Sequence, residues 1–302
     1  MRILLFLLFI LGGSLAYAGY ESKKFVEETP YVVRLKNGDM LTGFVAVVPA
    51  LDSADRSSIK LTTQLGAPTI YLDEIAEITP LDSYYRHKHR HYLLPTGISI
   101  KDDHFVGDFE ALFFYAGAGI TDYVSVTFGR SIAPFIPSSD QLSLLNFKAT
   151  LYSQEWDTFD GGMDLAVGSN LAFVNHNNRL VHFFTSTSFR LPKSILTGAV
   201  FYKTMGKDLY ELKFGNERVN LNYPDGSWGL ALGLDTRFTQ RKDLHFVGEI
   251  WNSDITRPTN TGILVGLRLA NTTFAADFGI SYFTAPFFAP YFSFVWTPAS
   301  AF

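Results

Sequence analysis

The sequence lacks cysteine altogether, which excludes both a disulfide framework and a lipid anchor on an N-terminal cysteine. Charged residues are scarce at 18%, whereas aromatic residues reach 16%; a disordered chain shows the reverse composition. No apolar run reaches the roughly 18 residues of a membrane-spanning helix, and no helical period recurs. The formal net charge of −4 provides no surplus of cations for phosphate groups, and we expect no nucleic-acid partner.

The first 18 residues have the features of a secretory signal peptide. Arg2 precedes the apolar run Ile3–Leu11, and Ala16 and Ala18 occupy the positions where signal peptidase prefers small residues. An apolar run of this length is too short to span a bilayer roughly 30 Å thick, and no stop-transfer pattern follows, which argues against an uncleaved anchor. We therefore expect residues 1–18 to be removed on export.

Short β-branched segments separated by turn residues make up the stretch 19–81. Asn37-Gly38 lies between two of them and supplies the positive φ angles of a tight hairpin turn. With Leu41-Thr42-Gly43 and Glu74–Ile78, this pattern resembles the small Sm-like or SH3-like β-barrels of exported bacterial proteins. The resemblance implies a small periplasmic β domain, and a fold of this kind implies no single activity.

Residues 82–91 differ in composition from both neighbouring stretches, because they are basic and aromatic. Three histidines alternate there with Lys88 and Arg90, so an extended backbone would place all three on one face, about 7 Å apart. They could bind a divalent metal, but the interleaved cations would repel it. We interpret the stretch as a solvated basic linker that rests against anionic lipid headgroups, with no metal or other cofactor.

From residue 92 to residue 302 apolar and polar residues alternate with a period of two. In Trp228–Phe238 the even positions are large and apolar except Thr236, and the odd positions are small or charged. Similar alternation recurs in 163–173 and 274–282. Alternating segments about ten residues long, separated by turn residues, are typical of transmembrane β-barrels.

We expect an all-β fold: a closed antiparallel transmembrane barrel of about twelve strands, preceded by the small periplasmic β domain. The strands are expected near 92–100, 109–118, 123–132, 143–152, 162–173, 180–190, 195–204, 228–238, 244–251, 262–269, 273–282 and 290–297. Short turns near 119–122, 191–194, 239–243 and 270–272 alternate with longer loops at 101–108, 133–142, 204–227, 252–261 and 283–289, so the short turns should face the periplasm. Two features leave the count open between ten and fourteen: 208–214 also has strand character, and Pro95 suits a strand interior poorly.

A soluble β-sandwich or lipocalin-like barrel would also show alternation, with its apolar face turned inward. The polar face of these segments argues against it, because glycine, alanine and aspartate occur where a soluble surface would carry lysine, glutamate and threonine. Charged residues of that face must line the lumen, since in hydrocarbon a basic residue at midplane costs roughly 2 to 4 kcal/mol. The expected lumen-lining residues are Glu110, Lys148, Asp164, Arg190, Lys203, Asp235, Arg237, His245, Glu249, Arg268 and Asp277.

These inward charges permit two interpretations of equal weight. They could form the selectivity-setting lining of a water-filled pore. They could equally form ion pairs that fill a closed interior, in which case the barrel would serve as a structural or interaction module. We expect pairs between neighbouring strands in either case.

A surface hydrolase is the third alternative, because one known family of twelve-stranded outer-membrane barrels is a phospholipase that uses Ser, His and Asn. This chain offers His176, and also His182 with Ser186 and Ser188 on the same strand face. None reproduces that family's His-x-Ser-Asn grouping, and side chains four residues apart on one strand lie about 13 Å apart. We therefore expect no enzyme activity.

The C-terminal residues also fit an outer-membrane protein. Phe292, Phe294 and Trp296 alternate on one face, and a terminal Phe302 resembles the aromatic C-terminus that the barrel-assembly machinery reads. Residues 92–302 resemble a loose group of poorly characterised bacterial outer-membrane β-barrels. The resemblance names no activity. From the charged lumen we expect a small channel or passive porin-like transporter, with outer-membrane lipid, lipopolysaccharide and the barrel-assembly machinery as partners. The sequence does not identify the solute.

Overall fold

The computed structural model describes residues 30–48, 57–63, 65–80, 86–102, 104–110, 113–132, 141–156, 161–174, 178–214, 217–238, 243–270, 273–283 and 287–298. The expected signal peptide, His176 and Phe302 lie outside these residues. The chain divides into two compact units, Met1–Tyr84 and Tyr85–Phe302. Within the described residues, no helix has the length and hydropathy needed to cross a membrane.

The first unit contains a five-stranded antiparallel sheet in the order β4-β3-β2-β1-β5. Its elements are β1 (Pro30–Leu35), β2 (Met40–Val48), β3 (Ser58–Thr62), β4 (Thr69–Tyr71), the 3-10 helix η1 (Leu72–Glu74) and β5 (Ile75–Pro80). Gly38, at φ 92°, lies in the turn between β1 and β2, a conformation that side chains other than glycine rarely adopt. Val33, Ile59, Leu61 and Ile70 form part of a core of the unit's own.

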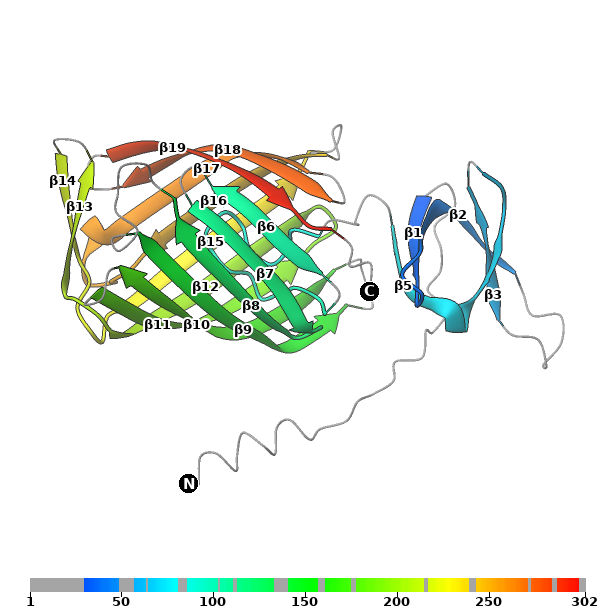
Figure 1. Cartoon of the computed structure of the whole chain (residues 1–302), viewed down its shortest axis with the longest axis horizontal. Coiled ribbons are helices and arrows are strands. Elements are labelled where there is room, and N and C mark those ends of the chain that lie inside the picture. The colour runs from blue at the N-terminus through cyan, green and yellow to red at the C-terminus, as the bar shows by residue number, and fades with distance from the viewer. Residues whose placement is uncertain are drawn as a thin grey trace, which may run out of the picture. The chain divides into compact units, whose positions relative to one another are not determined.

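In the second unit, twelve strands of the described chain close into an antiparallel barrel (Figure 1). They are β6 (Phe105–Glu110), β7 (Phe113–Thr121), β8 (Val124–Ser131), β9 (Leu142–Glu155), β10 (Gly162–Val174), β11 (Asn178–Arg190), β12 (Ser194–Met205), β15 (Trp228–Arg237), β16 (Leu244–Asn252), β17 (Thr261–Ala270), β18 (Phe274–Phe283) and β19 (Phe287–Trp296). Sequential strands pair throughout, and β19 closes the barrel on β6 through the register Ser293–Glu110 to Trp296–Gly107. The predicted fold class is confirmed.

Alternation along each strand separates an apolar exterior from a polar interior. In β15, Trp228, Leu230 and Leu232 are exposed, whereas Gly229 and Ala231 are buried. The same holds around the barrel, so large apolar side chains cover its outer wall. A closed wall that satisfies its own backbone and exposes apolar side chains is suited to lipid, and this is a transmembrane β-barrel of the outer-membrane type.

The connections differ between the two ends of the barrel. At one end, here called the turn end, lie the short connections 122–123 and 191–193, the start of β6 and the end of β19. At the opposite end, the loop end, lie the longer connections 132–141, 206–227 and 253–260. A connecting 3-10 helix, η3 (Pro258–Asn260), belongs to the last of these.

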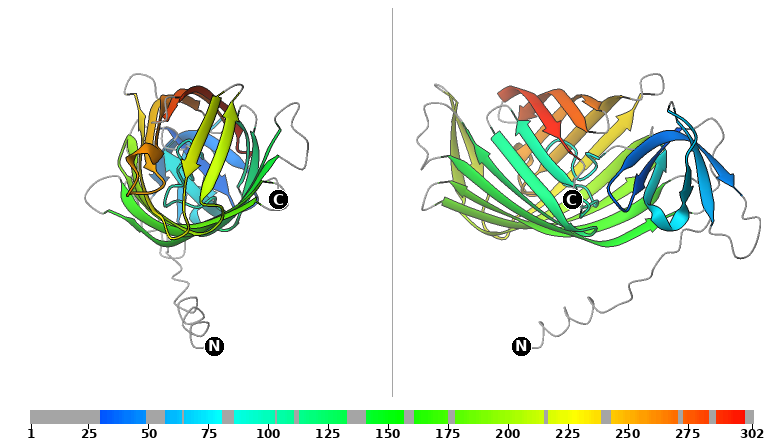
Figure 2. Two further views of the ribbon diagram at one scale, coloured as in Figure 1. Left: turned by 90° about the vertical axis from the view of Figure 1, so that its left-hand side faces the viewer. Right: turned by 45° about the vertical axis from the view of Figure 1, so that its right-hand side comes forward.

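The connection 206–227 carries a separate hairpin. Its strands β13 (Leu209–Phe214) and β14 (Glu217–Asn222) pair only with each other among the described strands. Figures 1 and 2 show this yellow-green hairpin standing across the loop end of the barrel. The strand character of 208–214 was thus a real signal, but the strand does not belong to the barrel wall.

The predicted count of twelve is right, whereas the first strand was misplaced. Residues 92–100 form no strand. β6 begins instead within the stretch 101–108, which we expected to be a loop. The expected strand 109–118 covers the last two residues of β6 and Phe113–Ala118 of β7. Pro95 gives the physical reason, because proline lacks the N–H that an interior barrel strand must donate. In β6, by contrast, Phe105 and Phe109 face outward, as a lipid-exposed strand requires.

The two faces of β15 can be tested at Leu232, which is 59% exposed in the middle of the strand. Leu232→Arg should reduce the yield of folded barrel severalfold, because a basic residue near the bilayer midplane costs about 2 to 4 kcal/mol. The yield is measured as the heat-modifiable band after insertion into lipid vesicles. Leu232→Ile is the matched control and should assemble normally; equal yields for both variants would show that this face does not contact lipid.

Candidate functional site

The interior of the barrel is occupied by residues 86–100, here called the luminal segment. Tyr92, Leu94 and Thr96 are almost fully buried, although they belong to no strand. Tyr92 packs with Val247 and Leu264 of β16 and β17, and Leu94 packs with Ala199 and Ala231 of β12 and β15. Figures 1 and 2 show this cyan segment inside the barrel, so the lumen is not an open tube in this structure.

The luminal segment folds back on itself before it reaches β6. His91 N donates to Leu94 O (2.9 Å), Thr96 N donates to His89 O (3.1 Å), and the Thr96 hydroxyl donates to Lys88 O (2.5 Å). Pro95 opposes Arg90 in an isolated bridge. The resulting compact turn satisfies part of its own backbone, as a segment buried away from water must.

Glu249 of β16 binds the tip of this turn. Its carboxylate accepts hydrogen bonds from the backbone N–H groups of Tyr92 (3.3 Å), Leu93 (3.2 Å) and Leu94 (3.0 Å). Three successive N–H groups that converge on one anion form a nest, which offsets the cost of burying the charge.

Lys148 of β9 binds the other side of the turn. Its ammonium donates to three carbonyls of the luminal segment: His89 O (2.6 Å), Thr96 O (3.3 Å) and Ile98 O (2.5 Å). An ammonium has three donors, so Lys148 is saturated by this one segment. The luminal segment is therefore held between β9 and β16.

Hydroxyl groups of β9 and β11 add further bonds to the backbone of the segment. Ser186 donates to Thr96 O (3.0 Å), Gly97 N donates to Ser188 Oγ (2.8 Å), and Thr150 donates to Gly97 O (2.8 Å). The two serines considered for hydrolysis thus bind the luminal segment, and His182 bonds Asn170 instead. These contacts give the hydrolase alternative no support.

A charged network connects β15 to β19 on the β16 side of the lumen. Arg268 donates to both carboxylate oxygens of Asp277 (2.7 and 2.9 Å) and to Asp235 (3.2 Å), and Asp235 also bonds His245 (2.6 Å). Arg268 further donates to His91 O (2.7 Å), which joins the network to the luminal segment. All of these side chains are buried, so the bidentate pairing compensates their desolvation.

A second ion-pair cluster starts from the luminal segment itself. The Arg90 guanidinium bonds Asp108 and Glu110 of β6 and lies 4.1 Å from the centroid of the Tyr115 ring. The stretch 82–91 is therefore not the solvated linker we expected: in its described part, His87, His89 and His91 are buried. The charge of Arg90 is balanced by carboxylates inside the barrel rather than by lipid headgroups.

Two glycines mark close approach between the wall and the segment. A Cβ at Gly233 of β15 would overlap the ring of His91, and a Cβ at Gly97 would overlap the backbone carbonyl of Asp164 in β10. At Gly97 two backbones pass too closely for a side chain, and at Gly233 a side chain would displace the His91 ring. The wall is shaped to this segment.

The buried histidines of the luminal segment are held neutral. Burial lowers the pKa of His87 to about 3, with Arg268 and Arg86 adding to the effect. Burial also lowers the pKa of His91 to about 4, with Arg268 and Lys148 opposing Asp235, and it lowers the pKa of His89 well below its usual range. Within the described residues, no three His, Asp or Glu side chains converge to hold a metal ion.

The remaining expected lumen residues lie nearer the two ends of the barrel. At the turn end Arg190 pairs with Asp164 (2.7 Å), and Arg237 donates to Pro192 O (2.7 Å) without joining the network. Lys203 lies fully buried near the loop end and pairs with Asp225 (3.0 Å) at the base of the β13–β14 hairpin. The eleven expected residues thus form separate groups at different heights in the barrel rather than one continuous ring.

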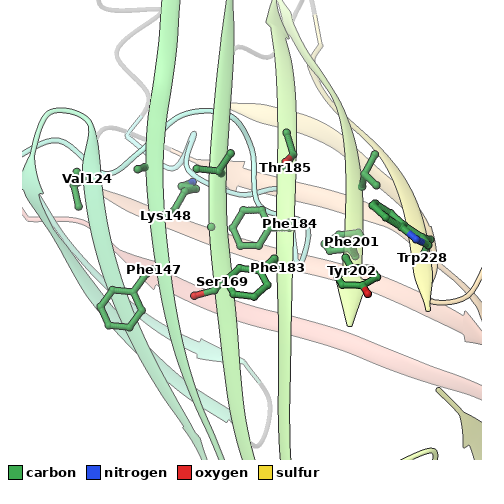
Figure 3. Close-up of a pocket in the computed structure, with 14 residues that line it drawn as sticks. Val124, Phe147, Lys148, Ser169, Phe183, Phe184, Thr185, Phe201, Tyr202 and Trp228 are labelled. Atoms are coloured by element: carbon green, nitrogen blue, oxygen red, sulfur yellow. The ribbon is translucent and has the colours of Figure 1, made fainter. Parts of the chain in front are cut away.

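The described residues line a cavity inside the barrel and a hollow on its outer wall. The inner cavity, of about 330 Å³, lies between the luminal segment and the strands β6–β11. The outer hollow, of about 580 Å³, lies over the wall strands β8–β12 and β15 (Figure 3). Its rim includes the exposed rings of Phe147, Phe183 and Trp228, so it opens on the lipid-facing surface. Of these two, the inner cavity is the one that faces the lumen.

Comparisons with known proteins give a fold-level similarity alone. No protein-family model and no curated protein matches the chain. Among solved structures, a KdgM porin is 9% identical with a TM-score of 0.36, covering 64% of this chain and 95% of that one. Pseudomonas aeruginosa OccK11 (OpdR) is 9% identical with a TM-score of 0.33, covering 85% and 76%. A mutant Rh. blastica porin is 8% identical with a TM-score of 0.34, covering 89% and 99%. These values establish no shared solute or activity.

The attachment of the luminal segment can be tested at Glu249. Because the chain has no cysteine, Ile98→Cys supplies a single reporter thiol on the segment. Glu249→Ala should raise its labelling rate by a water-soluble maleimide at least about tenfold, since three buried N–H groups lose their acceptor. The control is Glu155→Ala, which removes an exposed carboxylate of β9. Equal labelling in both variants would show that Glu249 does not hold the segment.

The lowered pKa values of His87 and His91 predict that acid loosens the segment. Histidine binds a proton more readily once the segment is released than while it is buried, so the free energy that holds the segment is fully present above about pH 6.5 and declines as the pH falls towards about 4. Hydrogen exchange of residues 86–100, corrected for its intrinsic pH dependence, should show protection falling across this range. Replacing the three histidines by glutamine should flatten the profile; an unchanged profile would refute the link.

Proposed function

We propose that the protein is a porin-like barrel of the outer membrane whose passive path for small solutes is closed by the luminal segment. The observation that supports this most directly is the choice of hydrogen-bond partners: two charged wall residues, Lys148 and Glu249, bind the backbone of the luminal segment. Without that segment, these charges would face a water-filled lumen.

The width of the barrel supports a path. Eight strands give an interior that wall side chains just fill, whereas sixteen or more leave an aqueous channel. Twelve strands lie between these cases, and here the inward side chains leave room for the entire luminal segment and for a cavity of about 330 Å³. A displaced segment would therefore open a continuous space lined by polar and charged groups.

The alternative function is a structural or interaction barrel with a permanently filled lumen. The close approach at Gly233 and Gly97 favours it, because a wall shaped to one segment suits a fixed plug. The Arg268–Asp277 pairing, which does not involve the segment's own side chains, is compatible with both functions.

We infer the orientation of the barrel in the outer membrane from its connections. Short turns of outer-membrane barrels face the periplasm, and Arg86 at the start of the luminal segment donates to Thr297 O beside the end of β19, at the turn end. The unit that precedes Arg86 would then be periplasmic, and we propose an Sm-like or SH3-like β domain there. Outer-membrane lipid, lipopolysaccharide and the barrel-assembly machinery remain the proposed partners.

The test is single-channel conductance in planar bilayers. The full chain should show little conductance, and a variant with residues 87–100 replaced by a Gly-Ser linker of equal length should show stable open channels. A reversible version uses Leu94→Cys with Ala231→Cys, two residues that pack in one cluster: oxidation should lock the closed state and reduction should restore the basal level. Heat-modifiable migration confirms that each variant retains the barrel. A folded linker variant that never conducts would establish the filled barrel instead.

A further inference from the structure

The inner cavity has a composition that the closing of the lumen does not explain. Its floor is the luminal segment at His89, Arg90, Leu93 and Pro95, and its wall comes from strands β6–β11. Its volume of about 330 Å³ falls within the range of small-molecule sites in proteins. A segment that served only as a filler would leave no such space.

A row of neutral polar side chains crosses the wall of the cavity. Asn146, Asn170 and His182 lie directly opposite one another on β9, β10 and β11. Asn146 Nδ2 donates to Asn170 Oδ1 (2.5 Å), which leaves Asn170 Nδ2 to donate to His182 Nε2 (2.6 Å). A neutral His182 that accepts at Nε2 carries its proton on Nδ1. The hydrogen bonds of the row therefore all run in one direction, from Asn146 through Asn170 to His182.

Two imidazole nitrogens beside the cavity have no hydrogen-bond partner among the described residues. One is His182 Nδ1, the donor at the end of the row, and the other is Nε2 of His89 in the floor. His89 is only 5% exposed, so an unpaired nitrogen there is costly unless a ligand or water bonds it. The edge of His182 against Phe201, 5.8 Å between ring centroids, fixes the direction of its ring.

The charged groups of the cavity already have hydrogen-bond partners within the protein. Arg90 bonds Asp108 and Glu110, and the three donors of Lys148 bind carbonyls of the luminal segment. A charged ligand would lose its hydration and would have to compete with these partners for hydrogen bonds. The cavity thus favours an uncharged ligand.

Apolar residues border the row on the side of the loop end. Leu144, Ala172 and Leu180 lie opposite one another one layer above Asn146, Asn170 and His182, and Leu142 and Phe113 extend this border. A ligand held here would have hydroxyl groups on one side and C–H groups on the other.

From this geometry we infer that the cavity is a binding site for a small uncharged, hydroxyl-rich solute of one or two sugar rings, reached from the loop end. His182 and His89 bond its hydroxyl groups, and the leucines contact its apolar face. The inference goes beyond the proposed function, because such binding requires no passage through the barrel.

The experiment measures binding of glucose and maltose by equilibrium dialysis and saturation-transfer NMR. It uses the full chain in lipid nanodiscs, which avoids sugar-based detergents, and it compares glucuronate and glucosamine as charged analogues. We expect saturable binding of at least one neutral sugar, and at least about fivefold weaker binding of both charged analogues.

Two variants locate the site. His182→Phe keeps the ring but removes the donor, and it should weaken binding at least about fivefold. Ala172→Trp should abolish binding by filling the cavity while leaving the polar row intact. Ser281→Ala is the matched control, because Ser281 faces inward from β18 outside the cavity, and its binding should be unchanged.

Three results would overturn the inference: no saturable binding of either neutral sugar up to about 10 mM, equal binding of the charged analogues, or binding that survives both cavity variants. Failure of the proposed function is separate, because it concerns the conductance of the linker variant. A barrel that binds maltose but whose linker variant does not conduct would contradict the proposed function alone. A linker variant that conducts, from a barrel that binds no sugar, would contradict this inference alone.

Discussion

A closed barrel of twelve strands encloses more space than its own inward side chains fill, and much of this structure follows from that constraint. The space must hold water or protein. Here it holds residues 86–100, whose backbone polar groups then need partners inside the barrel. Lys148, Glu249 and the hydroxyls of Thr150, Ser186 and Ser188 supply them. The polarity of the interior is thus matched to a buried backbone as much as to solvent.

The inward charges are satisfied in two physically different ways. Arg268 and Asp277 are direct neighbours in the register of β17 and β18, and Asp235 of β15 bonds His245 of the adjacent strand β16. Pairing between adjacent strands follows from alternation and strand order, and both can be read from a sequence. Lys148 and Glu249 instead bind carbonyls and N–H groups of a distant segment. Backbone groups have no sequence signature, so no pattern of residue types could have predicted those partners.

The same distinction decides how far the sequence predicts the fold. Period-two alternation identified the wall and the number of its strands, because each wall residue contacts either lipid or lumen, and the connection lengths separated the two ends of the barrel. Alternation failed at residues 92–100, most of which are buried inside the lumen. Pro95 was the available signal: it argued against a strand, and the exposed Phe105 and Phe109 of β6 offered the better first strand. The inner cavity was beyond prediction, because it depends on where the luminal segment lies.

The mode of attachment also bears on how such a segment could leave. Its main bonds to the wall join backbone groups to Lys148 and Glu249, and water can replace a backbone partner on either side once the lumen hydrates. The Arg268–Asp277 and Asp235–His245 pairs stay within the wall, so they need not break. Arg90 is the exception, because its departure would leave the neighbouring carboxylates of Asp108 and Glu110 on β6 without their cation. Release of the segment would therefore be resisted most strongly at β6, where Arg90 binds Asp108 and Glu110.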